Sequence, residues 1–269
     1  ITDPNSGRLR RSLLAPAGSV VVVRDLSNIE GRMLAWAANE QRALDVFRSD
    51  GCIYLDMAEA IFNAPRGSMN KRDHAFERQV GKAAVLGLGY GMSANKFWIT
   101  VNTGAAGTKM DMSFEESQRI VNIYRTVNSN IVRYWRDCDA AITIMASLNP
   151  GETRDFGPLT LTCGMAILPN GMALQYPGLH GEPNAFGGYD FTFGKGKKLY
   201  GSHFTENCIQ ALARVLLSQQ HLQIQAELDS NYGRDVARIV HSIHDELVVI
   251  APEQCGDEIY AMMGEVMSK

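Results

Sequence analysis

The chain has 269 residues, of which 45% are hydrophobic and 20% are charged, a balance typical of a folded globular protein with one large domain or two interleaved lobes. No apolar run approaches the roughly 20 residues needed to span a bilayer, and the opening residues lack a signal-peptide pattern, so we expect no membrane association. The five scattered cysteines include no CxxC pair, which argues against a disulfide framework or a zinc site, and the net charge of −3 does not by itself indicate nucleic acid.

In chain order, the first strong signal is an apolar β-branched run over residues 19–24 that ends in Asp25. Two similar runs, 236–243 and 247–250, flank Asp245 near the other end of the chain. A strand end is a place where a rigid scaffold can present an acid. The two aspartates are 220 positions apart, so only the fold can bring them together. If it does, they form a paired-carboxylate site for hard divalent cations.

Between these runs the pattern is mainly helical. Helical spacing and stop signals predict helices after Glu30 and over residues 50–62, 78–90, 113–127, 130–148, 204–230 and from 252 onward. Residues 160–176 predict a hairpin around Pro169-Asn170-Gly171, and residues 178–202 predict a loop or irregular hairpin. The basic segment 7–13 is interpreted equally well as a solvated loop or as a phosphate contact.

One predicted helix carries unusual chemistry. Arg78, Lys82, Leu86 and Tyr90 are spaced four apart, which on an α-helix places them along one slowly drifting face. Two cations, an apolar residue and an aromatic ring could hold a triphosphate at one end and stack a base at the other. The alternative is an ordinary amphipathic surface helix, and this segment without the flanking motifs favours that alternative.

Three motifs, in this order and spacing, resemble motifs A, B and C of the family A DNA polymerases. They are Asp25-x-Ser27-x-Ile29-Glu30-x-Arg32, Arg78-x3-Lys82-x7-Tyr90-Gly91 and His244-Asp245-Glu246. A single His-Asp-Glu triplet occurs by chance, whereas the ordered set of three is specific. The resemblance covers nearly the whole chain.

This resemblance implies an α+β right-hand polymerase fold with an antiparallel-sheet palm and mainly helical fingers. The palm would comprise residues 1–40 (motif A) and 196–269 (motif C), and the fingers with a connecting hairpin would comprise residues 41–195 (motif B). The thumb is not expected in this segment; it and any 3′–5′ exonuclease would lie upstream.

The resemblance also implies a function: template-directed DNA synthesis by two-metal nucleotidyl transfer from a deoxynucleoside triphosphate to a primer 3′-hydroxyl, with release of pyrophosphate. The implied catalytic residues are Asp25, Asp245, Glu246 and Lys82, and the implied ligands of two Mg²⁺ ions are Asp25, the Leu26 carbonyl and Asp245. The implied nucleotide-binding residues are Arg78, Lys82, Leu86, Tyr90 and Glu30, the last as a barrier to the sugar 2′ position. The implied DNA contacts are His244, Gln210, Asn207, Tyr90 and Arg10. We expect a monomer that binds primer–template DNA and deoxynucleotides in the cytoplasm of a bacterium or a phage-infected host.

Three positions depart from the family pattern. Leu86 stands where the family most often has phenylalanine or tyrosine, so we expect altered handling of nucleotides such as dideoxynucleotides without loss of activity. Leu26 replaces the usual tyrosine of motif A, where only the carbonyl is needed. Tyr54 stands where a phosphate-contacting histidine is expected, and that contact is therefore open.

Two other functions compete with DNA synthesis. A single-subunit RNA polymerase shares the layout, but such enzymes leave the position of Glu30 small and usually have serine where Glu246 stands. A catalytically inactive primer–template binding module is the second alternative. The presence of both aspartates together with Arg78 and Lys82 argues against it.

Overall fold

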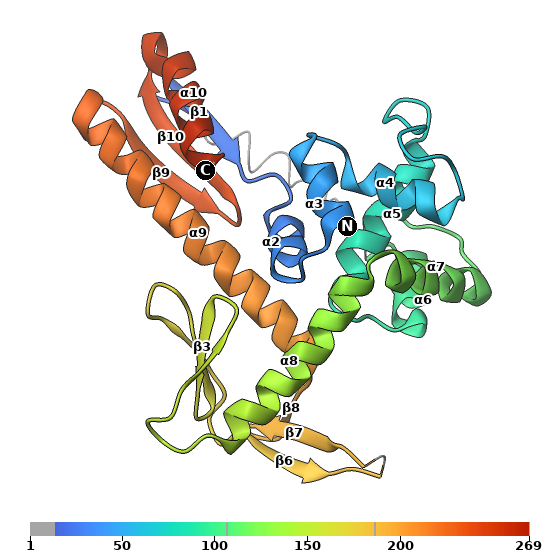
Figure 1. Cartoon of the computed structure of the whole chain (residues 1–269). Coiled ribbons are helices and arrows are strands. Elements are labelled where there is room, and N and C mark those ends of the chain that lie inside the picture. Colours follow the sequence, from blue (N-terminus) through green and yellow to red (C-terminus); the bar gives the residue numbers. More distant parts are fainter. Residues whose placement is uncertain (1–13, 106, 186, 269) are drawn as a thin grey trace. The chain divides into compact units, whose positions relative to one another are not determined.

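The computed structural model describes residues 14–105, 107–185 and 187–268, and these form two compact units (Figure 1). We call residues 30–211 the large unit, and the described residues up to 29 together with 212–268 the small unit. The small unit is therefore discontinuous in sequence. Its first strand and its C-terminal elements are separated along the chain by the whole large unit.

The small unit is built on a three-stranded antiparallel sheet (Figure 1). In order across the sheet, its strands are β1 (Ser19–Asp25), β10 (Glu246–Pro252) and β9 (Arg238–Ile243). Four consecutive valines in β1 favour extended backbone because their branched side chains restrict rotation about χ1. In the register, Val22 lies opposite Val249. The predicted antiparallel sheet is confirmed.

Two helices complete the core of the small unit. They are α10 (Gly256–Met267) and the C-terminal part of α9 (Gly201–Asn231). The main buried residues of this core are Val22, Leu217, Ile224, Leu228, Leu247, Val249, Ile259 and Met263. Because strands and helices contribute to one cluster, the strand ends at the edge of this core are held by the packing of the whole unit.

The large unit contains seven helices and two small antiparallel sheets within its described residues. The helices are α2 (Ile29–Ala37, which begins at the boundary), α3 (Gln41–Arg48), α4 (Ile53–Ile61), α5 (Ala75–Leu88), α6 (Ala94–Thr103), α7 (Phe114–Val127) and α8 (Ser129–Ser147), and α9 begins in this unit. One sheet has the strands β2 (Arg154–Phe156), β3 (Leu159–Thr162), β4 (Met165–Ile167) and β5 (Ala173–Gln175), and the other has β6 (His180–Pro183), β7 (Tyr189–Phe193) and β8 (Lys197–Leu199). Helices and antiparallel sheets together confirm the predicted α+β class. No helix in the described residues has the length and apolar character needed to cross a membrane.

Helices α4 and α5 cross with their backbones in contact at Gly81. A Cβ atom at this position would overlap the carbonyl oxygen of Tyr54 and lie 3.0 Å from the backbone nitrogen of Ala58. Only glycine permits this approach, although glycine lowers helix propensity. Val80 and Ala84 on the same helix are buried in the core of the large unit.

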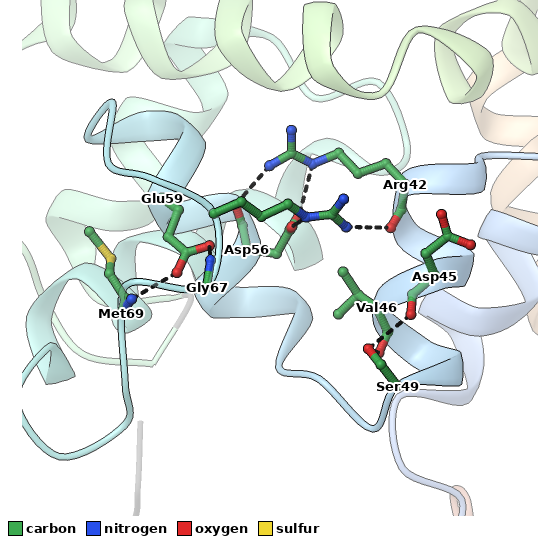
Figure 2. A network of polar contacts seen from close by, with 9 residues as sticks. Arg42, Asp45, Val46, Ser49, Asp56, Glu59, Gly67 and Met69 are labelled. Carbon is green, nitrogen blue, oxygen red and sulfur yellow. Dashed lines mark hydrogen bonds and ion pairs between the residues drawn. The ribbon is translucent and has the colours of Figure 1, made fainter.

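A buried carboxylate of α4 joins it to α3 and to the connection between α4 and α5 (Figure 2). The carboxylate of Asp56, whose residue is only 8% exposed, accepts from Arg42 Nε at 2.8 Å and from Arg66 Nε at 2.8 Å. Arg66 also donates through Nη2 to the carbonyl oxygen of Arg42 at 3.2 Å. The two guanidinium groups compensate the negative charge of the buried carboxylate. Their hydrogen bonds therefore fix the relative position of these segments.

A second buried carboxylate of α4 binds backbone groups of the same connection (Figure 2). Glu59 accepts from the backbone N–H groups of Gly67 and Met69, each at 2.8 Å. These charge-assisted hydrogen bonds order a segment that has no regular secondary structure. The chain therefore enters α5 from a fixed position on α4.

Helix α7 begins with a serine cap. The hydroxyl of Ser113 accepts from the backbone N–H of Glu116 at 3.1 Å, as a capping box predicts. The carboxylate of Glu116 instead pairs with Arg119, with 2.6 Å between Oε1 and Nη2. Of the two hydrogen bonds in a capping box, only the one accepted by the Ser113 hydroxyl is formed, because the Glu116 side chain is engaged by Arg119.

Several elements differ from the sequence-based expectation. The helices α3 and α6 were not predicted, and α6 is rich in β-branched residues, which lower helix propensity. The segment 178–202 forms the three paired strands β6, β7 and β8 and not merely a loop or irregular hairpin. Helix α5 ends at Leu88, so the prediction that Tyr90 shares its helical face was wrong. Glycines at 87, 89 and 91 weaken the helix there.

We predict that Gly81→Ala lowers the free energy of unfolding by about 1–3 kcal/mol, because the added methyl group forces α4 and α5 apart. Gly87→Ala is the matched control in the same helix, since its Cβ would meet the side chains of Met92 at 3.5 Å and Phe97 at 3.6 Å, which are ordinary contacts. That control should be neutral or gain up to about 1 kcal/mol of helix propensity. Urea titrations followed by circular dichroism measure both values. Equal stability of the two variants would contradict the close crossing.

Candidate active site

The small unit brings the two predicted metal-binding aspartates to one end of its sheet. Asp25 is the last residue of β1 and lies opposite Glu246, the first residue of β10. The backbone N–H of Leu26 then donates to the carbonyl oxygen of Asp245 at 2.9 Å. The strand pairing thus brings Asp25 and Asp245, which are far apart in sequence, to the same end of the sheet. The prediction of a paired-carboxylate site requires this proximity.

Side chains at this strand end differ in their exposure. Leu26 is 7% exposed and belongs to the core of the small unit. Asp25 is exposed, and Asp245 and Glu246 are intermediate in exposure. The buried side chain of Leu26 therefore anchors the backbone beside acids that keep part of their surface exposed.

The turn between β9 and β10 has a strained residue. His244 and Asp245 are the two residues that connect the paired positions Ile243 and Glu246. His244 has a φ of 50°, in the left-handed region that costs most residues roughly 1–2 kcal/mol. A large side chain kept at such a position is often retained for function, because glycine would be more stable there.

The donor set at this strand end suits a hard divalent cation. It consists of the exposed Asp25 carboxylate, the half-buried Asp245 carboxylate and the carbonyl oxygen of Leu26. That carbonyl oxygen already accepts from the N–H of Ile29 at 3.1 Å and has a second lone pair. No group of three or more His, Cys, Asp or Glu side chains in the described ranges is arranged to hold a metal ion by itself. Magnesium commonly binds through one or two carboxylates and completes its shell with water and substrate phosphates. The residues therefore fit Mg²⁺ in a site that substrate would complete.

In the large unit, α5 divides into a buried and an accessible face. Val80, Ala84 and Leu88 are buried in the core, whereas Leu86 is 54% exposed. Arg78 and Lys82 are intermediate and lie at the four-residue spacing from Leu86. The structure confirms a helical stripe of two cations and an apolar residue, without its predicted aromatic end.

The charges of Arg78 and Lys82 are the next feature of α5. Among the residues that the structure describes, no carboxylate lies within ion-pair distance of Arg78 or Lys82. Other arginines of the large unit, Arg42 and Arg119 among them, are paired with carboxylates. Two cations on consecutive helical turns, with no carboxylate partner in the described ranges, are suited to an anionic ligand such as a polyphosphate.

Tyr90 lies in the turn after α5 and contacts motif A. Its hydroxyl donates to Glu30 Oε2 at 2.9 Å. Burial, followed by the nearby Glu30 carboxylate, raises the pKa of Tyr90 far above its ordinary value, so the hydroxyl remains a hydrogen-bond donor at any physiological pH. The bond holds the Glu30 side chain beside the aromatic ring.

The residues predicted to contact DNA differ in their surroundings. Asn207 on α9 donates through Nδ2 to the hydroxyl of the buried Tyr176 at 3.0 Å, which fixes the orientation of its amide. Gln210, one turn further along α9, is exposed. Arg10 lies outside the described residues. Tyr176 is a supporting residue that the sequence did not indicate, because its partner is 31 positions away.

A cavity of about 310 Å³ in the large unit adjoins the turn that carries Tyr90. Its lining includes Gly91, Arg125, Trp135, Arg136 and Asp139. The indole N–H of Trp135 donates to a backbone carbonyl oxygen of the same turn, at 3.0 Å. Sequence patterns did not single out this cavity, since its residues come from separate helices.

Comparison with known proteins gives an independent result. The sequence model of the family described as DNA polymerase family A matches residues 1–144 of this chain. The DNA polymerase of Bacillus phage SP02 is 31% identical over 275 residues, an alignment that covers 97% of this chain and 40% of the phage protein. The thermostable DNA polymerase I of Thermus aquaticus is 27% identical over 124 residues, covering 46% of this chain and 13% of that protein. The chain thus spans less than half the length of these relatives.

A solved structure has a similar fold. It is the POL domain of Pol1 from M. smegmatis in complex with DNA primer-template and dNTP, with a TM-score of 0.71 and 18% sequence identity. The alignment covers 99% of this chain and 40% of that one. At this identity the likeness establishes the fold.

We predict that His244→Gly does not lower the free energy of unfolding, because glycine removes the strain at φ 50°. The matched control is His241→Gly, an exposed position in β9, which should lose about 0.5–1 kcal/mol since glycine weakens a strand. Chemical denaturation of both variants tests the difference. A loss in His244→Gly as large as in the control would show that the turn is not strained.

Proposed function

Because the chain belongs to DNA polymerase family A, we propose that it carries out template-directed DNA synthesis. In this reaction the primer 3′-oxygen attacks the α-phosphorus of a deoxynucleoside triphosphate. A new phosphodiester bond forms, the bond between the α- and β-phosphates breaks, and pyrophosphate leaves while the hydroxyl proton is released. The observation that carries the proposal is the β1–β10 ladder, which joins Asp25 and Asp245 at one strand end.

The carboxylates of Asp25 and Asp245 and the carbonyl oxygen of Leu26 are proposed to hold two Mg²⁺ ions, with Glu246 in a supporting role. Bound divalent ions would stabilise the attacking and leaving oxygens of an in-line phosphoryl transfer. The backbone of Leu26 is fixed by its buried side chain, which keeps its carbonyl group in place beside Asp25.

Arg78 and Lys82 are proposed to bind the triphosphate, with Lys82 also acting in catalysis. Their lack of carboxylate partners among the described residues leaves both positive charges available for phosphate oxygens. Leu86, exposed on the same face, would contact the nucleotide through apolar surface, without the stacking of an aromatic ring.

Glu30 is proposed as the barrier that selects deoxyribose. Its hydrogen bond with Tyr90 holds the carboxylate in one orientation, and a rigid group excludes an extra hydroxyl better than a mobile one. Glu30 is also the feature that favours DNA over RNA synthesis when the two polymerase alternatives are compared.

The proposed partners are primer–template DNA and deoxynucleoside triphosphates. His244, Asn207, Gln210, Tyr90 and Arg10 are proposed to contact DNA. Contacts from Asn207 and Gln210 to the minor groove would check the shape of a base pair and not its sequence, since the groove offers a nearly degenerate pattern. We further propose that the protein acts as a monomer in a bacterial or phage-infected cytoplasm, as its relatives from phages and bacteria suggest.

We predict that Asp245→Ala reduces magnesium-dependent primer extension by roughly a hundredfold or more, the factor that corresponds to losing several kcal/mol of transition-state stabilisation. The exposed Asp235→Ala is the matched control and should extend primers like the wild type. Extension assays with both variants provide the measurement. Full activity of Asp245→Ala would overturn the two-metal proposal, and primer–template binding by a wild-type protein that cannot extend would favour the inactive module.

We predict that Glu30→Ala increases ribonucleotide incorporation relative to deoxynucleotide by roughly tenfold or more, which corresponds to at least about 1.4 kcal/mol of lost discrimination. Tyr90→Phe removes the hydroxyl that orients Glu30 and should give a smaller shift in the same direction. Single-nucleotide incorporation with each sugar measures the ratio. An unchanged ratio in Glu30→Ala would remove this residue as the barrier.

A further inference from the structure

Arg78 is held differently from three other arginines of the large unit. Arg42, Arg66 and Arg119 each donate to a carboxylate within 2.9 Å. Arg78 has no such partner in the part of the chain that the structure describes, and its buried Nε atom makes no hydrogen bond. A cation on a long, flexible side chain needs some other contact if it is to keep one orientation.

That contact is the ring of Tyr54. The guanidinium carbon of Arg78 lies 5.4 Å from the centroid of the ring, within the range of a cation–π interaction. Tyr54 lies on α4 and Arg78 on α5, three residues before Gly81. The glycine contact occurs at the carbonyl oxygen of Tyr54 itself, so the closest approach of the two helices is also what brings the ring to the arginine.

The frame around Tyr54 is rigid. The same helix carries the buried carboxylates of Asp56 and Glu59, which bind α3 and the connection to α5 (Figure 2). Burial raises the pKa of Tyr54 by more than Arg78 lowers it, so the hydroxyl is not an anion that would pair with the guanidinium. The ring therefore attracts the cation without placing a negative charge beside it.

We propose that Tyr54 is a positioning residue for the triphosphate-binding cation Arg78. An aromatic face orients a guanidinium group without occupying its outer N–H donors, whereas a carboxylate would compete with the phosphate for both charge and donors. This inference rests on the proposed polymerase function and gives a role to the position where the family pattern leads one to expect a histidine. Tyr54 acts through Arg78 and is not assigned a contact with substrate.

The test compares Tyr54→Leu, which removes the ring, with Tyr54→Phe, which keeps it. In single-nucleotide incorporation, Tyr54→Leu should raise the KM for the deoxynucleotide about 3- to 10-fold, the range expected for a partly desolvated cation–π contact, with kcat within about 2-fold. Tyr54→Phe should restore the wild-type KM. In an Arg78→Ala background, Tyr54→Leu should raise the KM no further.

Tyr260→Leu is the matched control. The Tyr260 ring lies 4.2 Å from the guanidinium carbon of Arg24, in the small unit, and is exposed. Arg24 precedes Asp25 on β1, and neighbouring residues of a strand point to opposite faces. Loss of this ring removes a similar interaction and should leave the KM for the deoxynucleotide unchanged.

Binding of inorganic tripolyphosphate, measured by calorimetry, separates this inference from the proposed function. If the wild type does not extend primers, the polymerase proposal fails, yet Tyr54→Leu should still weaken tripolyphosphate binding about 3- to 10-fold relative to wild type and Tyr54→Phe. Tyr54→Met replaces Tyr54→Leu if circular dichroism shows that the latter does not fold. The inference is overturned if the KM and tripolyphosphate binding of the ring-less variant match the wild type, if Tyr54→Phe is equally impaired, or if the effect persists without Arg78.

Discussion

The antiparallel pairing of β1 with β10 is the constraint on which the candidate active site depends. It joins the two ends of a discontinuous unit and sets the register that places Asp25 opposite Glu246. Val22 is the β1 valine that is buried in the core, and a slip of one residue would turn its side chain to the other face of the sheet. The same hydrophobic core that fixes the register therefore also fixes the positions of the acids.

The large unit handles its charges in two ways, and the difference has chemical meaning. Arg42 and Arg66, which join their segments to α4 through Asp56, are paired with its carboxylate. Arg78 and Lys82 lack such partners in the described residues, and Arg78 lies against an aromatic ring. A charge that has been neutralised inside the protein has little left for a ligand, so unpaired cations on an ordered helix are the more informative ones.

Much of the fold follows from local patterns. The valine run of β1, the serine cap of α7 and the alternating strand pattern around Asp245 each act over a few residues, so they can be recognised without tertiary information. The elements that were missed, α3, α6 and the sheet of β6, β7 and β8, are short or rich in glycine and β-branched residues. For such segments tertiary packing outweighs intrinsic propensity. The end of α5 before Tyr90 belongs to the same class, because glycine permits several backbone paths.

The sequence by itself determined the family resemblance, the three ordered motifs and the residue types suited to metal and phosphate, because these are properties of residues at fixed short spacing. It could not determine that Tyr90 bonds to Glu30 or that Tyr176 orients Asn207, since these pairs are separated by 60 and 31 positions. The placement of Tyr54 against Arg78 also required the fold, because it depends on two helices meeting where Gly81 has no side chain. Contacts between distant segments arise from packing, and packing is settled only when the whole chain is folded.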